Sequence, residues 1–112
     1  MLSRTNRLTA KEITEIFKTG KVAHTAILSV RFVSTGIGTP KISAISPVKA
    51  FKTAVSRNRA RRAAYEGLKT IIPKLKVGVM AAVVLKPAVL NSDMDKIRHE
   101  LEAAFEKAGI LR

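Results

Sequence analysis

An unbroken apolar run at residues 79–85 constrains the fold of this chain more than any other feature. The run has the sequence Val-Met-Ala-Ala-Val-Val-Leu, with Gly78 before it and Pro87 shortly after it. Its length suits a strand, and a strand that lacks polar alternation is typically buried. The run therefore predicts a buried strand, on which other elements of the chain must pack.

The first helical signal lies near the start of the chain. Thr9 and Glu12 have the spacing of a capping box, in which each side chain binds the backbone amide of the other residue. Gly20 is a natural end for this helix. The helix is expected to turn one apolar face inward, formed by Ile13, Ile16 and Phe17.

Two further helices are predicted. The longer one spans residues 54–71, with Thr53 as its N-cap and Pro73 as its stop. The last one starts at Ser92 and ends at Gly109. Its core stripe comprises Met94, Ile97, Leu101, Phe105 and Ala108.

Two more strands complete the pattern. In residues 26–33 three apolar side chains, Leu28, Val30 and Phe32, alternate with a mixed, partly basic set. Residues 36–40, Gly-Ile-Gly-Thr-Pro, are typical of a turn and predict a hairpin into a second strand near residues 41–46. The elements predict an α+β fold in one domain over residues 1–112, in the order αββαβα, with the helices packed on one twisted sheet.

Charge is distributed unevenly along the chain, whose net charge is +13. No acid occurs between Ile16 and Tyr65, whereas ten lysines and arginines fall there. From Asn91 onward the balance is different, with five acids and four bases. A one-sided basic block of this kind is the electrostatic footprint of a protein that binds a polyanion.

Composition also bears on the compartment. The chain has no cysteine, which excludes disulfides and thiolate metal sites and suits a reducing cytosol. The polar N-terminal residues argue against a signal peptide, and no stretch is long and apolar enough for a membrane span. We therefore expect a cytoplasmic protein without a membrane partner.

The basic block is densest at the start of the long helix, in the motif Arg57-Asn58-Arg59-Ala60-Arg61-Arg62. Arginines near a helix N-terminus oppose the helix dipole, so stability alone does not explain them. Guanidinium groups match phosphate oxygens and stack on bases, and Asn58 suits a base edge or a 2′-hydroxyl. The motif predicts an RNA-binding face, with a solvated basic face as the plainer alternative. The opposite face carries mostly small residues and favours close packing on the sheet.

The motif and its surroundings resemble the bacterial ribonuclease P protein subunit. The signature of that family is a Ser/Lys-rich loop followed by a helix bearing Arg-Asn-Arg-x-Lys/Arg-Arg, to which residues 54–62 are similar. Weaker matches agree in order along almost the whole chain: Asn6-Arg7-Leu8, Phe17 with Gly20, Ser46 with Lys49, and Lys86-Pro87-Ala88. The similarity therefore extends well beyond the arginine motif.

Four positions depart from the family pattern. Ala50 replaces a loop lysine, Lys52 replaces a glycine before the helix, and Tyr65 replaces an arginine after the motif. Ile13 stands where the family has the first phenylalanine of a pair that ends at Phe17. Tyr65 could keep an RNA contact by stacking in place of charge.

The resemblance implies a division of labour between the protein and a catalytic RNA. The RNA would cleave the 5′ leader from precursor tRNA with Mg²⁺ ions that it holds itself. The protein would carry no cofactor and take no small-molecule substrate. Its RNA-binding residues would be Arg57, Asn58, Arg59, Arg61, Arg62, Ser46, Lys49 and Lys52. The resemblance also implies a twisted four-stranded sheet with a left-handed β-α-β crossover.

The resemblance further implies a surface for the single-stranded leader, between the first helix and the exposed face of the sheet. By position the candidates are Phe17, Arg31 and Lys86, with Ile13 a poorer one. Basic groups beside an aromatic ring are what sequence-tolerant single-strand binding needs. From the residues alone, Phe17 fits the core as well as the leader site, and Lys86 fits solvent as well.

Two other classes of function fit less well. A ribosomal or RNA-assembly protein would share the arginine helix but would have no reason to keep a second, single-strand site. A membrane-active amphipathic protein is disfavoured, because the apolar face of the arginine helix is too small to enter lipid. No catalytic constellation stands out, since His24 and His99 are isolated in the sequence.

Overall fold

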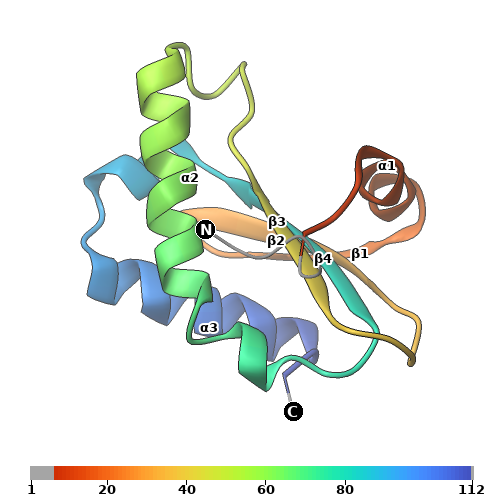
Figure 1. Cartoon of the computed structure of the whole chain (residues 1–112). Coiled ribbons are helices and arrows are strands. Elements are labelled where there is room, and N and C mark those ends of the chain that lie inside the picture. Colours follow the sequence, from red (N-terminus) through yellow and green to blue (C-terminus); the bar gives the residue numbers. More distant parts are fainter. Residues whose placement is uncertain (1–6, 112) are drawn as a thin grey trace.

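The computed structural model describes residues 7–111, so Asn6, one of the positions similar to the family, lies outside the described residues. The chain folds as a four-stranded sheet covered by helices on both faces (Figure 1). The elements in order are α1 (Ala10–Thr19), β1 (Lys21–His24), β2 (Leu28–Ser34), β3 (Lys41–Ile45), α2 (Ala54–Leu68), the 3₁₀ turn η2 (Ile72–Lys74), β4 (Val79–Leu85), the 3₁₀ turn η3 (Pro87–Asn91) and α3 (Met94–Ala108).

The apolar run forms β4, an interior strand of the sheet, as its composition predicts. The strand order is β1-β2-β4-β3, so β4 has a neighbour on each side. It pairs with β2 in antiparallel and with β3 in parallel orientation. The parallel pair is joined through α2, which is the β-α-β crossover connection expected from the resemblance.

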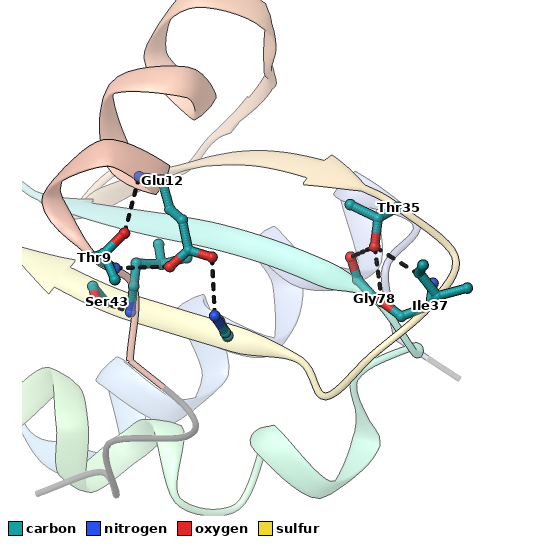
Figure 2. A network of polar contacts seen from close by, with 8 residues as sticks. Thr9, Glu12, Thr35, Ile37, Ser43 and Gly78 are labelled. Carbon is teal, nitrogen blue, oxygen red and sulfur yellow. Dashed lines mark hydrogen bonds and ion pairs between the residues drawn. The ribbon is translucent and has the colours of Figure 1, made fainter.

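The predicted hairpin between residues 26–33 and residues 41–46, which form β2 and β3, is wrong. β2 and β3 do not pair with each other, because β4 lies between them, with Val84 opposite both Ser29 and Ile45. The glycine-rich segment is a turn, but it packs on the start of β4. The Thr35 amide donates to the Gly78 carbonyl at 3.0 Å, and the Gly78 amide donates to the Gly38 carbonyl at 2.8 Å. Figure 2 shows the same junction, with the hydrogen bonds that the Thr35 side chain makes there.

Strand β1 is absent from the order predicted from periodicity. Of its four residues only Ala23 is buried, so it lacks the apolar alternation that reveals a strand. Pairing along β2 defines it instead, with Ala23 opposite Val30. With β1 the sheet has the four strands that the resemblance implies, and the order becomes αβββαβα.

Helices α2 and α3 pack on one face of the sheet and α1 on the other (Figure 1). The small residues of α2 make close packing possible. A Cβ atom on Gly67 would lie 2.7 Å from Cδ1 of Leu101, so α2 approaches α3 closely at this point. The core between these layers is closed by side chains that are almost fully buried, among them Leu28, Ile42, Phe51, Leu68, Leu85, Leu101 and Phe105.

Most helix ends follow the predicted capping signals. Thr9 and Glu12 form both hydrogen bonds of a capping box. The last helix was predicted to start at Ser92, but α3 begins at Met94, because Asp93 is its N-cap. Gly109 ends α3 in the left-handed conformation. Helix α2 ends at Leu68 rather than at residue 71, because the residues that approach Pro73 leave the α-helical path and form η2. Among the helices within residues 7–111, none has the length and apolar character that a membrane span requires.

Candidate nucleic-acid interface

The first turns of α2 present a cationic surface at the positive end of the helix. The Thr53 hydroxyl caps the helix by accepting the Ser56 amide hydrogen, and no acid occupies the first turn. Asn58, Arg59 and Arg62 are exposed. Because the helix dipole and the arginines have the same sign here, both favour an anionic ligand at this end.

Two of the predicted RNA-binding residues hold the loop that precedes α2. The Ser46 hydroxyl, which is only 5% exposed, donates to the Arg57 carbonyl at 3.1 Å. The Arg57 guanidinium donates to the Phe51 carbonyl at 2.8 Å, and the Phe51 ring is buried in the core. Lys49 and Lys52 extend from this loop and are exposed. Ser46 and Arg57 therefore fix the position from which the two lysines can reach a ligand.

The other arginines differ in how far they are already engaged. Arg59 donates to the Leu90 carbonyl at 3.3 Å, and Arg61 donates to the side-chain oxygen of Asn58. Within residues 7–111 no group pairs with Arg62. The surface thus combines guanidinium groups in fixed directions with one that is free to follow a ligand. Such a set can take phosphate oxygens through paired N–H donors.

Tyr65, one of the four positions at which the sequence departs from the pattern of the resemblance, contributes to the fold as well as to the surface. Its hydroxyl accepts the amide hydrogen of Ala44, on the edge strand β3, at 3.1 Å. The ring is half-buried and packs against the core. Sequence reasoning did not reveal this contact, because no local pattern connects Tyr65 with β3.

A second basic surface lies on the face of the sheet beside α1. The Cζ atom of Arg31 lies 4.9 Å from the centre of the Phe17 ring, which is the geometry of a cation–π contact. Phe17 is 41% exposed, so it is not a core residue, and Ile16 fills the core side of α1 instead. Ile13 is half-buried on the same helix. The structure therefore excludes the core alternative for Phe17.

Lys86 follows β4 directly and is hydrogen-bonded to the segment that connects β1 with β2. Its ammonium group donates to the Thr25 carbonyl at 2.6 Å, and its side chain is half-buried. Strand alternation and register add residues to this face that the sequence analysis did not single out. His24, Ser29, Val84 and Ile45 lie side by side across the four strands, on the same face as Arg31. We refer to this face, with Phe17 and Lys86, as the α1-side face.

Polar contacts hold α1 on the sheet beside this face (Figure 2). Glu12 forms an ion pair with Lys41 at 3.0 Å, and the Leu8 amide donates to the Ser43 hydroxyl at 3.0 Å. The Thr9 amide also donates to the Glu12 carboxylate at 2.9 Å. This hydrogen bond lowers the pKa of Glu12 below its ordinary value; partial burial opposes the shift, and the contact with Lys41 adds to it.

The described part of the chain holds no group of three or more His, Cys, Asp or Glu side chains arranged to bind a metal ion. His24 lies on β1 and His99 on α3, and both are exposed. Cationic, amide and aromatic groups are prominent on the two surfaces. Such groups can recognise phosphates and bases.

The sheet, the arginine start of α2 and the α1-side face together define an α+β protein built to bind nucleic acid. Comparison with known proteins gives the family. The sequence model of the family Ribonuclease P matches residues 2–109. The chain belongs to the ribonuclease P protein family.

Individual relatives agree with this assignment. The chain is 26% identical over 97 residues to the ribonuclease P protein component of Symbiobacterium thermophilum. The aligned region covers 87% of this chain and 84% of that protein. The RNase P protein of Staphylococcus aureus has a similar fold, with a TM-score of 0.82, 18% identity and coverage of 97% of this chain and 100% of that one. For the RNase P protein of Thermotoga maritima the TM-score is 0.78, with 20% identity and coverage of 90% and 96%. Family membership favours this assignment over a ribosomal or RNA-assembly protein.

Proposed function

We propose that this protein is the RNA-binding subunit of ribonuclease P and that it holds two RNA elements on two surfaces. The catalytic RNA docks on the start of α2 and its preceding loop. The 5′ leader of precursor tRNA lies on the α1-side face. The observation that carries the proposal is that the Arg31–Phe17 pair belongs to the α1 side of the sheet, whereas the arginine motif belongs to a helix packed on the other side.

The proposed docking of the catalytic RNA rests on the charge, the exposure and the fixed positions of residues at the start of α2 and in the preceding loop. Asn58, Arg59, Arg61 and Arg62 all come from the first turns of one helix, and Lys49 and Lys52 come from the loop that Ser46 and Arg57 fix. Phosphate contacts of this kind supply most of the affinity of a protein for nucleic acid and depend strongly on salt. Ser46 acts in this scheme through the Arg57 carbonyl, as a positioning residue.

The binding of the leader rests on an aromatic ring beside basic groups. A base can stack on the exposed side of Phe17, while Arg31 and Lys86 attract the phosphates. Half-buried Ile13, Ile45 and Val84 offer apolar surface to the bases. None of these contacts reads a base edge specifically, so the leader would be bound with little regard to its sequence.

The cleavage that produces the 5′ end of tRNA is assigned to the RNA in this proposal. Mg²⁺ takes oxygen ligands, chiefly carboxylates and phosphates, whereas guanidinium and ammonium groups, which repel a cation, outnumber carboxylates on the two proposed RNA surfaces. The Mg²⁺ ions of the holoenzyme are therefore assigned to the RNA, and the protein contributes affinity and position. Cysteine-free composition supports the further proposal that the holoenzyme works in the cytoplasm.

Reconstitution with a catalytic RNA of the ribonuclease P type tests the proposal. Added protein should increase the rate of precursor tRNA cleavage at low Mg²⁺, because protein cations replace part of the charge screening that the metal otherwise provides. Wild-type protein is compared with the double variant Arg59→Gln, Arg62→Gln. The proposal would be contradicted if wild-type protein bound the catalytic RNA no more tightly than the double variant does and also left the cleavage rate unchanged.

A further inference from the structure

A groove runs along α2, beside the arginine motif. It is lined by Asn58, Arg61, Arg62, Tyr65 and Glu66 and has a volume of about 570 Å³. This volume falls within the range of roughly 300–1,000 Å³ that is typical of small-ligand sites. The groove contains two features that phosphate binding does not require: an aromatic ring and a carboxylate.

We infer that this groove is a binding pocket for one unpaired guanine base of the partner RNA. The inference rests on the proposed function and deepens it, because it names what the arginine helix binds besides phosphates. It concerns a position, Tyr65, at which this chain differs from the family pattern.

The Tyr65 ring is held in place at both ends, which makes it a fixed platform for a base. Its inner side packs against the core, and its hydroxyl accepts the Ala44 amide hydrogen at 3.1 Å. A base that stacks on the ring therefore costs little side-chain entropy. Stacking on an aromatic side chain is tolerant of base identity, so the choice of base must come from the other groups of the groove.

Glu66 favours a base with two adjacent donors. It is the first acid after the long acid-free block, and its carboxylate pairs with Lys69 at 3.1 Å. Both side chains of this pair are more than half exposed, so the pair is weak and the carboxylate can exchange partners. A carboxylate beside arginines repels phosphate, but it can accept two parallel hydrogen bonds from N1 and N2 of guanine.

The other bases lack this match. Adenine and cytosine each place one amino donor beside a ring nitrogen acceptor, and uracil places its one N–H between two carbonyl oxygens. In each of these bases a lone pair would face a carboxylate oxygen. Guanine also presents two acceptors, O6 and N7, on its other edge. The amide hydrogens of Asn58 and the guanidinium of Arg62, which have no hydrogen-bond acceptor within residues 7–111, can donate to that edge.

The protein contains its own reporter for this pocket. Tyr65 is the single tyrosine of the chain, and the chain has no tryptophan. Tyrosine fluorescence therefore reports only on the groove. The probes are short uridine-rich single-stranded RNAs that carry either one central guanine or one central adenine. The guanine probe should quench the fluorescence and bind about 5-fold more tightly or better, the lower end of what one bidentate base contact discriminates.

Variants separate base recognition from charge. Glu66→Gln should remove the preference for guanine, because the amide replaces one acceptor by a donor. Glu102→Gln is the matched control, since Glu102 is a surface acid that also pairs with a lysine, Lys74 at 3.7 Å, away from the groove. The control should retain the preference. Tyr65→Phe should also retain it, whereas Tyr65→Leu should weaken binding of both probes.

A second measurement uses the complex with the catalytic RNA. Kethoxal modifies N1 and N2 of unpaired guanines, the same atoms that Glu66 would engage. Wild-type protein should protect a guanine that Glu66→Gln leaves reactive. Equal binding of the two probes, or identical protection by both proteins, would overturn the inference. If cleavage is still stimulated in that case, the proposed function stands; a guanine preference without any stimulation would instead contradict the proposed function alone.

Discussion

The guanidinium of Arg31 lies over the ring of Phe17, with its Cζ atom 4.9 Å from the ring centre, and so joins a strand residue to a helix residue in one exposed surface. The pair is the most distinctive feature of the α1-side face. A protein that bound only a folded RNA through α2 would gain nothing from it. The pair gives the leader-binding part of the proposal a specific geometry that substitution can test.

Replacing Phe17 should weaken leader binding without unfolding the protein. Phe17→Ala removes a stacking platform, and base stacking on an aromatic ring contributes roughly 1–3 kcal/mol. The affinity of the holoenzyme for leader-bearing precursor should fall by about 5- to 100-fold, while its affinity for mature tRNA is unchanged. Because Phe17 is 41% exposed, the melting temperature should change little. Ile16→Ala, at a fully buried neighbour, should instead cost about 2–5 kcal/mol of stability.

The exposed arginines of α2 should determine the salt dependence of RNA binding. Arg59→Gln and Arg62→Gln each remove one cation, so the slope of log affinity against log salt should decrease by about 0.7–0.9 per lost phosphate contact. Titrations of the catalytic RNA at several salt concentrations measure this slope. Arg98→Gln is the control, since Arg98 lies on α3 and pairs with Asp95. A slope that is the same in wild type and in both α2 variants would remove these arginines from the phosphate interface.

The Glu12 contacts predict a pH-dependent stability. Because the pKa of Glu12 is lowered in the folded protein, its contribution is complete above the ordinary glutamate pKa of about 4.3 and disappears as the pH falls through the folded value. Glu12→Gln should therefore lower the stability by about 0.5–1 kcal/mol at neutral pH and by nothing in strong acid. Thermal unfolding across this range measures the difference. Glu15→Gln, on the exposed side of the same helix, should match wild type throughout.

The junction at Gly78 offers a matched pair of glycine substitutions. Gly78 and Gly36 both have a φ of +76°, so alanine is strained at either position. A Cβ on Gly78 would also lie 2.5 Å from the Ile37 amide nitrogen, whereas a Cβ on Gly36 meets nothing within 4 Å. Gly36→Ala should cost about 1–2 kcal/mol and Gly78→Ala clearly more. Equal melting temperatures for the two variants would show that the loop does not pack on β4 as described.

Much of the fold follows from local signals in the sequence. The capping box at Thr9, the N-cap Thr53 and the helix end at Gly109 each act within a few residues, and each was predicted from side-chain chemistry. The apolar run of β4 gave its bounds directly, because a strand covered on both faces has no polar residue to obscure its limits.

The predictions that failed concern which strands pair with each other and which exposed segments form strands. The turn at residues 36–40 is correctly located, but a turn does not determine which strand becomes the neighbour of β2. That choice depends on β4, which is distant in sequence and apolar on both faces, and which fits between β2 and β3. Strand β1 carries too few buried residues to be periodic. Both features are decided by tertiary packing rather than by local propensity.

The residues of the candidate site likewise fall into two groups: those that the sequence identified, and those whose roles depend on distant partners. Residue type and charge identified the arginine motif, and the resemblance added Phe17, Arg31 and Lys86. Roles that depend on distant partners could not be read from the sequence: Ser46 bound to the Arg57 carbonyl, Tyr65 bound to the Ala44 amide, and Lys86 bound to the Thr25 carbonyl. In each case the partner is a backbone group, which leaves no trace in the sequence.

Leader binding by the protein is tested by comparing leader-bearing precursor with mature tRNA as ligands of the reconstituted holoenzyme. The measured quantity is the ratio of the two affinities, with and without the protein. We expect the protein to raise this ratio, longer leaders to raise it further until the α1-side face is filled, and Phe17→Ala to return it towards the value of the RNA alone. A ratio that the protein leaves unchanged at every leader length would contradict leader binding by the protein.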